Sequence, residues 1–201
     1  MATVPLETVD GFLKAMLVLS RTADYVLETK SVKEAVKEPL SSSKVQILRL
    51  LGQRGSQTST QIARYLGVTK PAVSQIIDSL VTRKMVARKP AKHDRREIGL
   101  TLTESGKRSM TAIRRQQRQA IRGALRSAGS GAVRQWIKAA EQMAAAMATA
   151  DKAYEQFCGQ CDAHEDSSCV LCDDGKTNCL FRAHETKLLA RRERAKERAS
   201  A

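Results

Sequence analysis

Five cysteines close together are the residues of this chain best placed to do chemistry. All five cysteines of the 201 residues lie between 158 and 179, spaced Cys-x2-Cys-x7-Cys-x2-Cys-x6-Cys. Each Cys-x2-Cys pair can place two thiolates on one metal ion, so we expect either zinc held by four cysteines or a [4Fe-4S] cluster. Reversible thiol chemistry and ordinary free cysteines are the alternatives. The ligand candidates are Cys158, Cys161, Cys169, Cys172 and Cys179.

Positive charge is concentrated in the middle of the chain. The formal net charge is +14, and residues 44–108 hold 14 Lys and Arg against 4 Asp and Glu, whereas residues 1–43 hold 5 against 6. A compact basic module of this kind fits a polyphosphate partner such as nucleic acid. The sequence contains no Gly-rich phosphate loop and no paired catalytic carboxylates, so we expect no enzyme.

The basic region carries the pattern of a helix-turn-helix. A helix is predicted over Lys44–Arg54, N-capped by Ser42 or Ser43 and stopped by Gly55. A short helix over Thr58–Leu66 then ends at Gly67, and another begins after Thr69 as its N-cap. A pair of helices joined by a tight Gly-containing turn is typical of proteins that place the second helix in the DNA major groove.

In that second helix one side is apolar, with Val73, Ile76, Ile77 and Leu80 at helical spacing. The residues that should therefore point away from the core are Pro71, Ser74, Gln75, Asp78 and Thr82.

A two-stranded wing is predicted after Met85. The apolar period changes there from helical to alternating, and Ile98, Leu100 and Leu102 should face one way on a strand. A basic loop joins the two strands, and such a loop can insert an arginine into the narrow minor groove. The loop includes Pro90, Lys92, His93, Asp94, Arg95 and Arg96.

Long helices flank this module. One is predicted over Val9–Glu38, stopped by Pro39, and two more run from Glu104 to a break at Gly129–Gly131 and from Ala132 to Tyr154. The predicted fold is mainly α, with this division of the chain: 1–40 an N-terminal dimerisation helix, 41–106 a winged helix-turn-helix, 107–157 C-terminal dimerisation helices, 158–184 a Cys-rich metal-binding extension, and 185–201 a helical tail of mixed charge.

These residues resemble the MarR family of bacterial transcriptional regulators. The resemblance rests on the segment that starts at Thr69 and reads TKPAVSQIIDSL, on KMV from Lys84, and above all on DRREIGLTLTESG from Asp94 to Gly106. It covers residues 8–155 and does not include the cysteine cluster. It implies an obligate homodimer on a pseudo-palindromic operator in double-stranded DNA, with room in some relatives for a small anionic effector.

The resemblance also implies roles for single residues. Ser74 and Gln75 would approach base edges, and Arg96 would enter the minor groove, oriented by Asp94, with Arg95 near a phosphate. Thr69, Lys70 and Pro71 would lie near the DNA backbone or thymine methyl groups. The remaining phosphate contacts would come from Lys84, Arg88, Lys89 and Lys92, together with Lys70.

Together these features predict a dimeric, sequence-specific transcriptional regulator. We expect it to be cytoplasmic, because no segment of the sequence is typical of a membrane span or an export signal. The cysteine cluster would modulate it as a metal, iron-sulfur or redox site. The alternative is an architectural protein that binds DNA with little sequence preference and carries a structural zinc ion.

Overall fold

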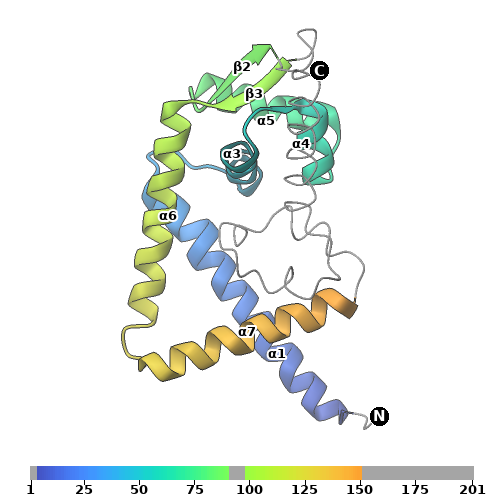
Figure 1. The fold of residues 1–201 in the computed structure, drawn as a ribbon, viewed down its shortest axis with the longest axis vertical. Helices are drawn as coiled ribbons and strands as arrows, with labels where there is room; N and C mark the ends of the chain where they lie inside the picture. Colours follow the sequence, from blue (N-terminus) through green and yellow to red (C-terminus); the bar gives the residue numbers. More distant parts are fainter. Residues whose placement is uncertain (1–3, 91–97, 151–201) are drawn as a thin grey trace, which may run out of the picture. The chain divides into compact units, whose positions relative to one another are not determined.

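The computed structural model describes residues 4–90 and 98–150 (Figure 1). Contacts divide the chain into two compact units, Met1–Ser127 and Ala128–Ala201. None of the described helices is long and apolar enough to cross a membrane. The elements of the first unit are α1 (Leu6–Asp24), the π-helical η1 (Tyr25–Lys30), α2 (Ser31–Ala35), α3 (Ser42–Arg54), β1 (Gln57–Thr58), α4 (Ser59–Leu66), α5 (Lys70–Thr82), β2 (Val86–Pro90), β3 (Ile98–Leu102) and α6 (Glu104–Ala124).

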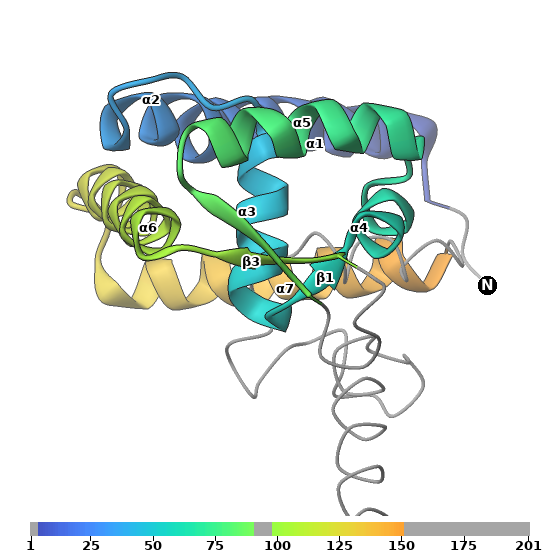
Figure 2. The same ribbon diagram turned by 90° about the horizontal axis from the view of Figure 1, so that it is seen from above.

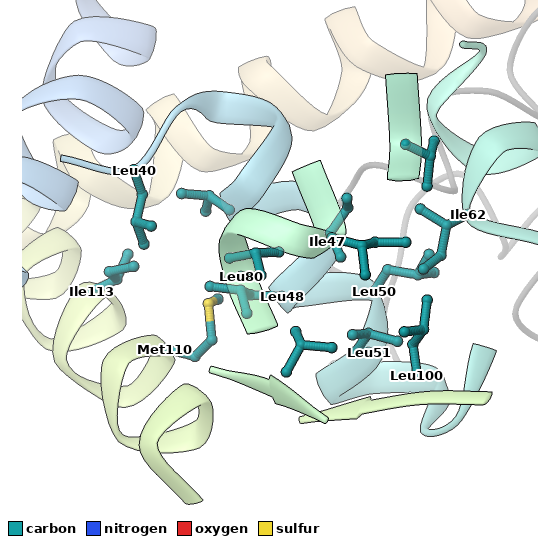
Figure 3. Close-up of a cluster of buried hydrophobic side chains, with 14 of the residues drawn as sticks. Leu40, Ile47, Leu48, Leu50, Leu51, Ile62, Leu80, Leu100, Met110 and Ile113 are labelled. Atoms are coloured by element: carbon teal, nitrogen blue, oxygen red, sulfur yellow. The ribbon is translucent and has the colours of Figure 1, made fainter. Parts of the chain in front are cut away.

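Helix α3 is the centre of the first unit. Figures 1 and 2 show it between α6 and α4, and it also contacts α5 and β3. Its Ile47, Leu48 and Leu50 are at most 1% exposed and meet Leu80 of α5 and Leu100 of β3 (Figure 3). Burying each side chain of this size contributes roughly 1.5–3 kcal/mol to the free energy of folding. Because α3 shares this core with α4, α5, α6 and β3, it holds these elements together.

A small antiparallel sheet closes one side of this core. Its order is β1-β3-β2, with Gln57 opposite Leu100 and Val86 opposite Leu102. Strands β2 and β3 confirm the predicted two-stranded wing, and β1 adds a short strand that the sequence pattern did not indicate. Ile98 does not share the environment of Leu100, since it is 60% exposed at the end of β3, opposite Pro90.

The first predicted helix, Val9–Glu38, is helical from Leu6 to Ala35 but is not α-helical throughout and ends earlier than predicted. The backbone is α-helical to Asp24, changes to a π-helical turn over Tyr25–Lys30, and resumes as α2 only to Ala35. Val36 is already extended (φ −128°), three residues before Pro39. The extended segment allows Leu40 to turn into the core, where it is 8% exposed.

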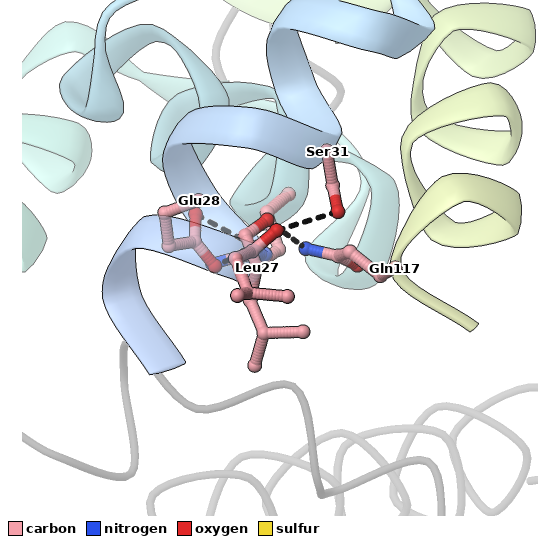
Figure 4. Close-up of polar contacts among 6 residues, drawn as sticks. Leu27, Glu28, Ser31 and Gln117 are labelled. Atoms are coloured by element: carbon pink, nitrogen blue, oxygen red, sulfur yellow. Dashed lines mark hydrogen bonds and ion pairs between the residues drawn. The ribbon is translucent and has the colours of Figure 1, made fainter. Parts of the chain in front are cut away.

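The π-helical turn is held by side chains from three elements (Figure 4). Arg49 of α3 pairs with Glu28 at 3.0 Å, Gln117 of α6 donates to the Leu27 carbonyl at 2.9 Å, and Ser31 Oγ donates to the Val26 carbonyl at 2.7 Å. A π-helical turn leaves backbone carbonyls without their usual α-helical donors. Gln117 and Ser31 supply such donors, and the Arg49–Glu28 ion pair and the Gln117 bond tie this turn to α3 and α6.

The predicted N-caps were partly wrong. Helix α3 begins at Ser42, two residues before the predicted Lys44, so Ser41 is its N-cap instead of Ser42 or Ser43, and the Ser41 side chain makes no capping hydrogen bond. Thr69 does precede α5 as N-cap, but its side chain caps nothing either. Gly55 ends α3 as expected, with a positive φ of 71°.

The second unit contributes α7 (Ser130–Ala150) to the described chain. The helix begins at Ser130, within the predicted break at Gly129–Gly131 and two residues before the predicted first residue, Ala132. Trp136, Ile137 and Met147 on α7 are each about half exposed.

Candidate nucleic-acid interface

Hydrogen bonds fix both ends of α4, the helix that precedes the turn to α5. At its start, Thr58 and Gln61 form a reciprocal capping box, with Thr58 N–H donating to Gln61 Oε1 at 2.8 Å and Gln61 N–H donating to Thr58 Oγ1 at 3.3 Å. At its end, Gly67 adopts a left-handed conformation (φ 67°) and Val68 N–H bonds back to the Ala63 carbonyl. A left-handed residue with this bond ends a helix sharply, and Gly adopts it without strain. The turn therefore sets the direction of α5.

Helix α5 presents one exposed stripe to solvent. Val73, Ile77 and Leu80 are buried against the core, whereas Pro71, Gln75, Asp78 and Thr82 are exposed. Successive residues of a helix are 100° apart, so these four positions lie within one narrow sector opposite the buried face. We call this set the α5 stripe. Pro71 fits the first turn because the N–H that it lacks has no helical partner there.

Ser74 is not a member of the α5 stripe, contrary to the prediction. Its side chain is half-buried, and its hydroxyl donates to the Lys70 carbonyl at 3.1 Å. The residue lies on the flank of the helix, because it follows the buried Val73 and precedes the exposed Gln75. Its hydroxyl satisfies the backbone of its own helix in this conformation.

The end of α5 carries an unusual left-handed lysine. Lys84 has φ 56° and is the one described non-glycine residue with positive φ. Lys84 N–H bonds to the Val81 carbonyl at 2.8 Å and Met85 N–H to the Leu80 carbonyl at 3.0 Å. This is the Schellman pattern, in which glycine is the usual residue at the left-handed position. A lysine there keeps a cation exposed between α5 and the wing at a conformational cost of about 1–2 kcal/mol.

The start of α6 is locked onto this turn. Thr103 Oγ1 donates to the Lys84 carbonyl at 2.6 Å and accepts from Gly106 N–H at 3.1 Å. A side chain at position 106 would place its Cβ 2.3 Å from the Met85 carbonyl oxygen. Only glycine therefore permits this close approach, which gives the Leu-Thr-x-x-Gly pattern (Leu102–Gly106) a structural role.

An ion pair joins α5 to the wing. Arg88 Nη2 on β2 bonds to Asp78 Oδ1 on the α5 stripe, with both side chains well exposed. Arg88 is one of the predicted phosphate contacts, and Lys89 next to it on β2 is exposed. The pairing was not foreseen, although two opposite charges on either side of a helix-to-strand turn are a signal for it.

Several predicted site residues lie outside the described chain. They are Lys92, Asp94, Arg95 and Arg96 of the wing loop and the cysteines Cys158, Cys161, Cys169, Cys172 and Cys179. Among the residues that are described, no group of three or more His, Cys, Asp or Glu could hold a metal ion. The structure does bring Lys70, Pro71 and Gln75 onto α5, Lys84 onto the turn after it, and Arg88 and Lys89 onto β2.

Comparison with known proteins agrees with this arrangement. The sequence profile described as the MarR family matches residues 39–97. A curated relative, the uncharacterized HTH-type transcriptional regulator YpoP of Bacillus subtilis (strain 168), is 31% identical over 77 residues. That match covers 38% of this chain and spans about half, 55%, of the relative.

Solved structures extend the likeness to the fold of most described elements. RV1404 from Mycobacterium tuberculosis has a TM-score of 0.64 at 22% identity, covering 72% of this chain and 97% of that one. A MarR family protein from Bacillus stearothermophilus has a TM-score of 0.61 at 14% identity, with coverages of 72% and 99%. The fold is thus a mainly α, MarR-like winged helix-turn-helix.

Proposed function

We propose that this chain is a dimeric, sequence-specific DNA-binding transcriptional regulator of the MarR type. The single observation that carries the proposal is the α5 stripe, which projects polar side chains from a rigid helix next to basic side chains of β2. A solvent-facing helix of this kind fits the major groove of B-DNA, which is about 12 Å wide.

Within this proposal some of the described residues contact bases and others contact phosphates. Gln75 is exposed at the centre of the α5 stripe, and glutamine can bond bidentately to adenine with a discrimination of about 1–3 kcal/mol. Lys70 on α5, Lys84 on the turn after it and Lys89 on β2 are exposed and would bind phosphates, which gives affinity but no sequence preference. The wing loop, with Arg96 oriented by Asp94, would reach the adjacent minor groove.

A second copy of the chain is the proposed occupant of the apolar face of α1. No described residue of α1 is buried, and Leu6, Leu13 and Leu17, which share one face at helical spacing, are 75%, 55% and 54% exposed. A hollow of about 530 Å³ lies along another side of this helix, lined by Gly11, Lys14, Ala15, Val18, Leu19 and Thr22. Monomeric proteins rarely expose so continuous an apolar surface. Light scattering after chromatography should give twice the 22.1 kDa chain mass, and a single-copy mass would contradict this part of the proposal.

The cysteine cluster extends the proposal to a cofactor. Two Cys-x2-Cys pairs and a fifth cysteine suit zinc or a [4Fe-4S] cluster that modulates DNA binding. The support is the spacing in the sequence alone. Anaerobic purification followed by iron, sulfide and zinc analysis distinguishes the two, and protein that retains none of them would favour thiol chemistry. Unchanged operator affinity after Cys161→Ser and Cys172→Ser, in every metal and redox condition, would remove the regulatory role.

Selection of duplexes from a random-sequence pool tests the proposed function. A sequence-specific dimer should enrich an inverted repeat whose half-sites are about 10 base pairs apart or a multiple of that. Binding that is steeply dependent on salt but enriches no sequence would favour the architectural alternative instead. Failure to bind any duplex would contradict both.

A further inference from the structure

Helix α6 carries a row of arginines on the face opposite the core. Met110 and Ile113 are buried, and Gln117 reaches the Leu27 carbonyl, so these residues define the inner face. Arg115, Arg118 and Arg122 lie on the other side, and all three are exposed. We call these three residues the arginine stripe. A shallow hollow of about 360 Å³ runs along it, lined by Thr111, Arg114, Arg115, Arg118, Gln119 and Arg122.

Among the described residues, no carboxylate pairs with Arg115, Arg118 or Arg122. Residues 105–140 contain nine Lys and Arg and no Asp or Glu. Among the described residues the carboxylates pair with Arg49, Lys30, Arg83, Arg88 and Lys107, and none pairs with the arginine stripe. Lys107 is bonded to Glu104 at 2.7 Å, and this contact holds the pKa of the Glu104 carboxyl below its usual range.

Such a row disfavours the helix unless an anion binds it. Arg118 and Arg122 are four residues apart, and Arg115 and Arg118 are three apart, so their like charges face each other along the helix. A merely solvated helix face usually alternates charges of both signs. An anionic partner would remove this repulsion.

The chemistry of the row fits a phosphodiester backbone. The guanidinium group is planar and bonds bidentately to phosphate, and Thr111 and Gln119 offer further donors beside it. From Arg115 to Arg122 the helix rises about 10 Å, roughly the axial length that three phosphates of one DNA strand occupy at 3.4 Å each. No apolar side chain lines the hollow, whereas protein partners need apolar or aromatic anchors at an interface centre.

We infer that the arginine stripe is a second nucleic-acid contact that binds the phosphate backbone of duplex outside the segment held by the winged helix. The inference rests on the proposed DNA-binding function and extends it to a surface on α6. Because the contact is to phosphates, it adds affinity and salt dependence without sequence preference. It also requires a duplex longer than the site that the winged helices cover.

The test compares a short and a long mixed-sequence duplex, of about 20 and about 60 base pairs, since the winged helices of a dimer cover about two helical turns. Binding to each is measured by fluorescence anisotropy over a range of salt concentrations and expressed per binding site. The variant is R115Q/R118Q/R122Q in the full chain. The charge-matched control is R21Q/K33Q/K37Q, which changes three exposed cations outside α6.

The triple variant should weaken binding to the long duplex at least about tenfold, and should reduce the slope of log K against log salt by about 2.7 for three lost phosphates. Its affinity for the short duplex should stay within about twofold, and the control should lose little on either. Equal losses on both duplexes, or no loss on the long one, would overturn the inference. A different outcome would point to an acidic protein as the partner. In that case the unaltered chain would bind immobilised poly-glutamate, the triple variant would not, and the variant would still bind the long duplex normally, which would overturn the inference. If the unaltered chain bound neither duplex, the proposed function itself would fail.

Discussion

Asp78 on α5 and Arg88 on β2 form an ion pair that links the exposed stripe of the helix to the first strand of the wing. An acid at this position faces the same side as Gln75, so under the proposed function it lies close to DNA phosphates. Asp78 therefore places a negative charge on the proposed interface. It also pairs with Arg88, so that this cation is not free to bind a DNA phosphate.

Asp78→Asn should strengthen binding to mixed-sequence DNA. The substitution removes a repulsive charge and releases Arg88 for a phosphate, so the slope of log K against log salt should steepen by about 1. Arg88→Ala should have little effect in the unaltered chain but should reverse the gain in the Asp78→Asn background. Equal effects of Arg88→Ala in both backgrounds would show that the pair does not restrain Arg88.

Gly106→Ala should destabilise the fold. The new Cβ would lie 2.3 Å from the Met85 carbonyl oxygen, and overpacking of this kind costs about 1–3 kcal/mol or more in the free energy of unfolding. Gly123→Ala is the matched control in the same helix, because nothing lies within 4 Å of its Cβ position. Urea unfolding should show the control unchanged or stabilised by up to about 1 kcal/mol. Similar midpoints for the two variants would contradict the close approach at Gly106.

Lys84→Gly should have opposite effects on stability and on DNA binding. Glycine relieves the left-handed strain at φ 56°, which should raise the free energy of unfolding by about 0.5–1 kcal/mol. The loss of the cation should weaken binding to any duplex and lower the salt slope by about 1. Lys89→Gly, on the extended strand β2, should weaken binding similarly but should not stabilise the fold. A stability loss in Lys84→Gly would show that the turn does not need the left-handed conformation.

Glu28→Gln should destabilise the protein far more than Glu34→Gln. Glu28 pairs with Arg49, whose side chain is only 8% exposed, whereas Glu34 pairs with Lys30 at 4.0 Å on the surface. Removing the partner of a buried charge costs about 3 kcal/mol or more, reduced here because the Glu28 side chain is 28% exposed. The exposed pair should contribute at most about 1 kcal/mol. Thermal unfolding of the two variants compares them, and equal losses would mean that the Arg49 contact does not stabilise the π-helical turn.

The winged helix could be predicted from sequence because its signals are local. Gly55 and Gly67 end helices at the expected residues, and the apolar spacing of Val73, Ile77 and Leu80 identified the buried side of α5. Helical periodicity reports such faces wherever one side of the helix packs on a core.

Features that depend on tertiary contacts were missed. The π-helical turn at Tyr25–Lys30 needs Arg49 and Gln117, which come from helices far along the chain. Ser74 was assigned to the exposed face because the periodicity did not distinguish the flank of α5 from its centre. The arginine stripe does have a local signal, because Arg115, Arg118 and Arg122 recur at helical spacing.

The most direct test of the account asks whether Gln75 reads a base. Duplexes selected from a random pool would be compared for the unaltered chain, for Gln75→Ala, and for Gln135→Ala, which changes an exposed glutamine on α7. We predict that Gln75→Ala loses its preference at one position of each half-site, with a loss of about 1–3 kcal/mol in discrimination there, and that Gln135→Ala selects the same sequence as the unaltered chain. An identical selected sequence for Gln75→Ala would contradict the claim that the α5 stripe reads DNA.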